Sequence, residues 1–89
     1  MDKNILVKKL YSLIDATINY SMDSDEARLK AIDIFVYLGI AENEQKRELV
    51  LMNFTTIAKD LVAPDTIEIK QSIIDMWYAF IQSVIITDK

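Results

Sequence analysis

The sequence predicts an all-α protein, a compact bundle of four to six helices in a single domain over residues 1–89. The chain has one glycine and one proline, too few for the many tight turns of a β-sandwich or barrel. Apolar residues make up 52% of the chain and charged residues 27%, a globular rather than a disordered composition. A chain of 89 residues has room for one small hydrophobic core.

A first helix is predicted from about Ile5 to Tyr20. Its polar residues recur at helical spacing and lie on one face: Lys8, Ser12, Asp15 and Asn19. The rest of the helix is apolar over more than the roughly 100° that an ordinary surface helix presents to its core. Either this helix is central in the bundle, or part of its apolar face binds a partner.

A second helix is predicted to end at Leu38, because Gly39 supplies a left-handed C-terminal cap. At its start, Asp23 and Glu26 have the spacing of a capping box. The acidic residues there resemble a calcium loop only faintly, since Arg28 stands where such a loop needs glycine. The segment 31–38 is apolar nearly all round, which is typical of a core helix.

The middle of the chain is a polar run over residues 41–48, followed by an apolar segment. Asn53 is placed to cap a further turn or helix that continues through Leu61. Alternatively, residues 50–51 form a short buried strand, although the sequence offers no second strand to pair with it.

A last helix is predicted from near Thr66 to about Ile85, because Asp65 and Glu68 repeat the capping-box spacing. An aromatic cluster over residues 77–81 lies at helical spacing within it and is interpreted mainly as core. Part of its apolar surface lies off the main stripe and is a candidate interface.

The residue types that the sequence lacks restrict its chemistry. Without cysteine there is no disulfide framework, thiolate zinc site or thiol nucleophile. Without histidine the chain lacks the usual acid–base residue at neutral pH and the commonest metal ligand. One glycine cannot build a phosphate-binding loop. We therefore expect a binding protein rather than an enzyme, with no cofactor and no metal.

The net charge of −4 disfavours non-specific nucleic-acid binding, which depends on Lys and Arg neutralising phosphates. The same charge either keeps a small domain soluble or faces a basic partner. Lys8 and Lys9 interrupt the N-terminal apolar stretch, which is unlike a signal peptide. No apolar run approaches the roughly 18 residues of a membrane span, so we expect a cytoplasmic protein.

A series of landmark residues runs in order over the whole chain. They are Met1, Lys3, Asn4, Ile5, Val7, Tyr20, Ser21, Arg28, Ile32, Gly39, Ile40, Leu49, Asn53, Phe54, Ile57, Leu61, Asp65 and the final Thr87-Asp88-Lys89. In this order, with short gaps, the chain resembles the AsiA anti-sigma factors of T-even-like bacteriophages. These proteins are all-helical and have about this length.

The resemblance implies an anti-sigma factor that acts in the cytoplasm of a bacterial host. It implies binding to region 4 of the host's primary sigma factor within RNA polymerase, which blocks recognition of the −35 promoter element. With a phage middle-promoter activator, the same complex is redirected as a co-activator complex to phage middle promoters. It also implies a homodimer when the protein is free, no direct nucleic-acid binding alone, and no membrane contact.

The family uses its first helix and the end of its second for the sigma contact and an overlapping self-dimer. On this chain the corresponding residues are Lys9, Leu10, Leu13, Ala16, Thr17, Tyr20 and Leu38. On this basis Leu13→Asp is expected to abolish the complex and to leave the helical circular dichroism intact.

The chain departs from the family at several of these positions. Lys9 replaces an acidic residue, and Ala16 and Thr17 replace large aliphatic residues. The glycines that divide the family's last segment are absent from residues 75–79, so one longer helix is expected here.

Two other functions remain open at this point. The first is a cytoplasmic bacteriocin-immunity helical bundle, although such proteins tend to be rich in lysine and this chain is acidic. The second is a small DNA-binding repressor, although no clear basic recognition helix is present.

Overall fold

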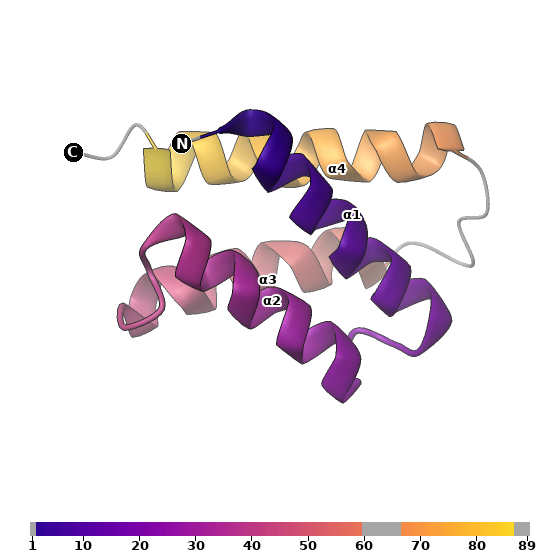
Figure 1. Ribbon diagram of the computed structural model, residues 1–89, viewed down its shortest axis with the longest axis horizontal. Coiled ribbons are helices and arrows are strands. Elements are labelled where there is room, and N and C mark those ends of the chain that lie inside the picture. The colour runs from indigo at the N-terminus through magenta and orange to yellow at the C-terminus, as the bar shows by residue number, and fades with distance from the viewer. Residues whose placement is uncertain (1, 60–66, 87–89) are drawn as a thin grey trace.

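The computed structural model describes residues 2–59 and 67–86, and within them the chain is helical throughout its regular structure (Figure 1). The elements are α1 (Lys3–Asn19), α2 (Asp25–Leu38), α3 (Glu44–Lys59), α4 (Ile67–Ile81) and a π-helical segment, η1 (Gln82–Ile86). No strand occurs in these residues. The predicted all-α bundle of four to six helices is confirmed.

Helix α1 is the central element of the bundle. It runs diagonally across the front of Figure 1, with α4 above it and α2 below it, and it packs against both. Helix α3 lies behind α2 in this view and packs against α4. The wide apolar face of α1 is therefore explained by burial on two sides, the first of the two alternatives that its sequence left open.

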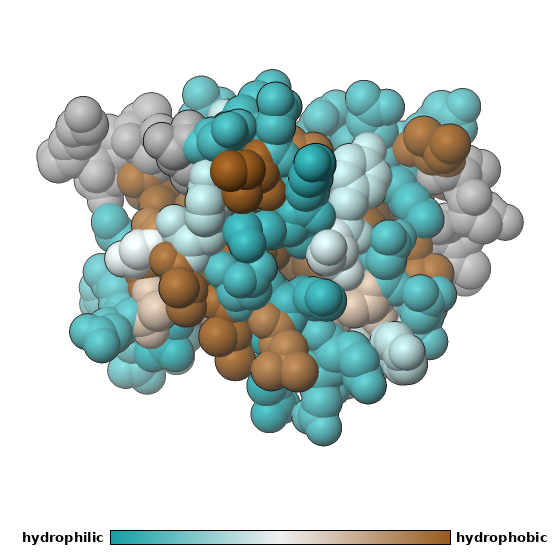
Figure 2. Space-filling view, in the orientation of Figure 1, coloured by the Kyte–Doolittle hydropathy of each residue, from teal (hydrophilic) through white to brown (hydrophobic). Residues whose placement is uncertain are grey.

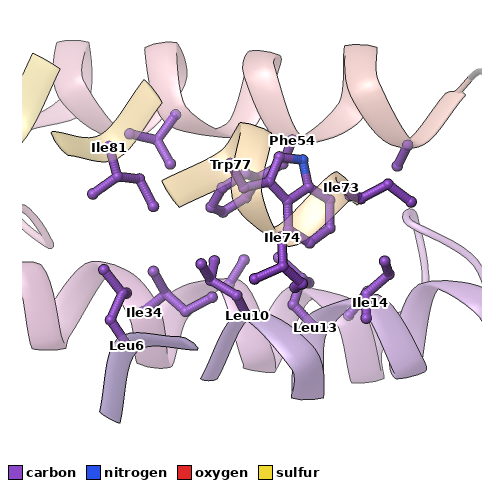
Figure 3. Close-up of a cluster of buried hydrophobic side chains, with 14 of the residues drawn as sticks. Leu6, Leu10, Leu13, Ile14, Ile34, Phe54, Ile73, Ile74, Trp77 and Ile81 are labelled. Carbon is purple, nitrogen blue, oxygen red and sulfur yellow. The ribbon is translucent and has the colours of Figure 1, made fainter. Parts of the chain in front are cut away.

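The hydrophobic core draws residues from α1, α2, α3 and α4, and α2 contributes Ala27, Ala31, Ile34 and Phe35; part of the cluster is drawn in Figure 3. Its largest fully buried side chain is Trp77 on α4, whose ring centroid is 4.8 Å from that of Phe54 on α3, with the planes tilted by 49°. The other labelled members of the cluster are Leu6, Leu10, Leu13, Ile14, Ile73, Ile74 and Ile81. The interpretation of the C-terminal aromatic cluster as mainly core is confirmed for Trp77 and Ile81.

Side-chain caps fix where the first two helices begin. The Asp2 carboxylate accepts a hydrogen bond from the Asn4 N–H at 2.8 Å and starts α1. The Ser24 hydroxyl accepts from the Ala27 N–H at 3.1 Å and starts α2. The N-cap of α2 is therefore Ser24, and the predicted capping box at Asp23 is wrong by one residue.

Helix α3 corrects the prediction for the middle of the chain. The Asn43 side-chain oxygen accepts from the Lys46 N–H at 3.1 Å, so the helix begins within the polar run and continues without a break through Asn53. The polar residues form the outer face of an amphipathic helix whose inner face carries Val50 and Phe54. The predicted new start at Asn53 and the alternative strand at residues 50–51 are both wrong.

Residues 67–86 follow the expected continuous helix. Helix α4 passes directly into η1, and no break divides residues 75–79. The predicted helix end at Leu61 and the predicted caps and start at Asp65 and Thr66 lie outside the described residues.

Gly39 ends α2 in the left-handed conformation, with φ of 75°, as predicted. Its N–H donates to the carbonyl oxygens of Phe35 and Val36. We expect Gly39→Ala to lower the free energy of unfolding by about 1 kcal/mol, because a Cβ disfavours this backbone conformation. A Cβ would meet nothing within 4 Å, so the cost comes from the backbone alone. Urea denaturation measures it, and a Gly39→Asn variant that loses as much as Gly39→Ala would contradict this explanation.

Candidate interaction surfaces

The structure places three of the predicted contact residues of α1 inside the core. Leu10 and Leu13 are fully buried, and Ala16 is nearly so. They point between α2 and α4 rather than outward, because α1 is packed on both sides. In this conformation Leu10 and Leu13 offer no surface to a partner. Burial of Leu13 also removes the basis for expecting Leu13→Asp to leave the helices intact.

Three other predicted residues contribute to packing inside the bundle. The Lys9 ammonium lies 2.8 Å from Oδ2 of Asp33 and 5.4 Å from the centroid of the Tyr37 ring, so it joins α1 to α2. The Thr17 hydroxyl donates to the Leu13 carbonyl oxygen at 2.9 Å within α1. Leu38 is partly buried against the core at the end of α2.

Tyr20 is the one predicted residue with a freely accessible side chain, 63% exposed at the end of α1. Together with Ala16 it lines a shallow depression between α1 and α2, which we call the α1–α2 edge. Its other lining residues are Ser12, Asp15, Asn19, Glu26 and Lys30. This edge is polar and of mixed charge around one large aromatic side chain.

A second surface, on α2, was missed by sequence reasoning. Leu29, Ile32 and Val36 are 65%, 47% and 61% exposed and lie at i, i+3 and i+7 on one helix face. Figure 2 shows hydrophobic side chains gathered along α2 in the lower half of this view. The prediction of a core helix over residues 31–38 therefore holds for Ala31, Ile34 and Phe35 but not for Ile32 and Val36. Only one side of α2 is buried, and a near-continuous apolar run does not reveal which side that is.

Beside these exposed residues of α2, a pocket of about 160 Å³ opens between α2 and α3. Asp23 and Arg28 are exposed charged residues on its lining. We call it the α2–α3 groove, and the apolar residues of its wall include Ala31, Ile32, Phe35 and Leu51. The sequence carried no signal for it, because the outward position of Ile32 and Leu51 follows from how the helices pack.

The acidic residues around the start of α2 lie next to its N-cap or in its first turn. Ser24 caps the helix, and Asp25 and Glu26 lie in its first turn, where they favour the positive end of the helix dipole. Across residues 2–59 and 67–86, no group of three His, Cys, Asp or Glu side chains is arranged to hold a metal ion. No helix in that part of the chain is both long and apolar enough to cross a membrane.

Comparisons of the chain with protein-family models, with curated proteins and with solved structures found no match.

Proposed function

We propose that the protein is a phage anti-sigma factor that binds region 4 of the bacterial host's primary sigma factor. By occupying that domain it blocks recognition of the −35 promoter element. With a phage middle-promoter activator it acts as a co-activator and redirects RNA polymerase to phage middle promoters. Its place of action is the cytoplasm of the host, and the free protein pairs with a second copy through the surface that later binds sigma.

The ordered landmarks along the chain support this proposal, and so does the net charge of −4. A domain that reads DNA is basic on its reading face, so an acidic partner suits it. The structural observation that supports the proposed contact is the exposure of Tyr20, because it is the accessible aromatic residue among the seven predicted positions. Tyrosine is enriched among residues that dominate binding energy, since its ring gives a large contact area with few rotamers to restrict.

The direct test is calorimetric titration of the protein into purified region 4 of a host's primary sigma factor. We expect a one-to-one complex that Tyr20→Ala weakens by about tenfold or more, equivalent to about 1.4 kcal/mol. The control is Met76→Ala, a half-exposed apolar residue on α4 away from the α1–α2 edge, which should bind as the wild type does.

Two outcomes of this titration would contradict different parts of the proposal. Absence of binding by the wild type to region 4 domains of several hosts would sink the anti-sigma function. Equal binding by the wild type and Tyr20→Ala would leave the function standing and remove the α1–α2 edge as its site.

A further inference from the structure

We infer that the α2–α3 groove is a second protein-binding surface, and that its occupant is a basic amphipathic helix of a partner protein. The inference rests on the groove alone and does not depend on the sigma factor being a partner. It assigns a function to the exposed apolar residues of α2, Leu29, Ile32 and Val36, which do not line the α1–α2 edge.

The apolar part of the surface has the form of a helix-binding groove. Ile32 of α2 and Leu51 of α3, both exposed, line the pocket, and Leu29 and Val36 continue the exposed apolar face of α2 beside it. Helices that dock in such grooves insert side chains spaced at i, i+3 or i+4, and i+7. An apolar cavity of about 150 Å³ holds one benzene-sized group. The pocket of about 160 Å³, whose wall also carries Asp23, Arg28 and Thr55, has room for one side chain of that size from the occupant.

The charges around the groove are mostly negative. On α2, Asp25 precedes Leu29 by one helical turn on the same face. On α3, Glu48 and Glu44 precede Leu51 by about one and two helical turns, next to the pocket rather than on its lining. These three carboxylates are exposed, as is that of Asp23 on the lining.

Two bases offset these four acids in part: Arg28 on the lining and Arg47, one helical turn before Leu51, so the surroundings of the groove stay net negative. None of these six side chains takes part in an ion pair within the part of the chain that the structure describes. Uncompensated negative charge beside an apolar groove selects an occupant that carries Lys or Arg beside its apolar face. The same charge repels nucleic acid, an anionic membrane surface and an acidic helix.

The experiment uses two fluorescent peptides of about 15 residues, long enough to form a helix on binding. Both carry leucine at i, i+3 or i+4, and i+7. All the remaining positions are lysine in one peptide and glutamate in the other. Fluorescence anisotropy with the full chain should show one-to-one binding of the lysine peptide, at least about tenfold tighter than the glutamate peptide. Binding should weaken when salt is raised well above about 0.1 M, because salt screens exposed charges.

Matched variants separate the groove from the rest of the surface. Ile32→Gln and Glu48→Lys should each weaken binding of the lysine peptide by about tenfold. The control for Ile32→Gln is Ile5→Gln on α1, because the exposed fractions of the two isoleucines are similar, 47% and 44%. The control for Glu48→Lys is Asp75→Lys, which reverses the charge of an exposed acidic residue on α4. Both controls should bind as the wild type does. Circular dichroism confirms that all four variants are folded.

Several results would overturn the inference. They are no binding of the lysine peptide, equal binding of the two peptides, and equal losses in the groove variants and their controls. A wild-type dimer in light scattering that Ile32→Gln dissociates would assign the groove to a second copy instead, and would also overturn it.

Discussion

The Leu13→Asp variant is expected to be unfolded at room temperature. Leu13 is fully buried on α1, between α2 and α4, and among residues 2–59 and 67–86 no cation lies in the core to pair with a carboxylate there. The lost packing costs about 2–5 kcal/mol, and burial of an unpaired carboxylate adds several more. A domain of this size has a total stability of about 4–13 kcal/mol, so the substitution removes most or all of it. Far-UV circular dichroism should show loss of most of the helical signal.

The control for this variant is its immediate neighbour in the sequence. Ser12 is exposed, so Ser12→Asp should keep the helical signal and a cooperative urea transition. If Leu13→Asp instead kept both, the packing of α1 between α2 and α4 would be wrong for the protein in solution. Loss of partner binding in a Leu13→Asp variant would not identify a contact, because unfolding alone produces it. Tyr20 is the sounder residue with which to test the sigma contact.

Trp77→Ala is expected to lower the free energy of unfolding by about 3–5 kcal/mol. Trp77 is fully buried on α4 and packs against Phe54 of α3, so the substitution opens a cavity in the middle of the core. Urea denaturation followed by circular dichroism measures the loss, since the variant lacks the only tryptophan.

Two further variants test the physical reason for this loss. Met76→Ala truncates the adjacent, half-exposed side chain and should cost less than about 1 kcal/mol. Trp77→Phe should be more stable than Trp77→Ala by about 2 kcal/mol, because it keeps most of the ring. It also removes an indole N–H that is buried without a hydrogen-bond acceptor among the described residues. A Trp77→Ala variant as stable as Met76→Ala would contradict the central position of this ring.

The two proposed surfaces lie on opposite sides of α2. Glu26 and Lys30 line the α1–α2 edge, whereas Arg28 and Ile32 line the α2–α3 groove. Residues two positions apart on a helix point in very different directions, so the two surfaces share no lining residue. Occupants of the two sites would therefore contact α2 from different sides and bind at the same time.

Features that depend on neighbouring residues in the chain followed from the sequence. The all-α class, the extent of α1, and the left-handed end of α2 at Gly39 were predicted, because periodicity and backbone conformation decide them locally. The start of α3 was not, since Asn43 and Asn53 are both capable caps and the polar residues between them fit either a loop or an outer helix face.

Which apolar faces are buried was decided only by the tertiary structure. The broad apolar face of α1 fits a central helix and a docking helix equally well, and packing by both α2 and α4 assigned it to the core. Helix α2 is apolar nearly all round at its C-terminal end, and its position in the bundle left Ile32 and Val36 outside. Burial depends on which elements meet in space, and hydrophobicity along one helix does not contain that information.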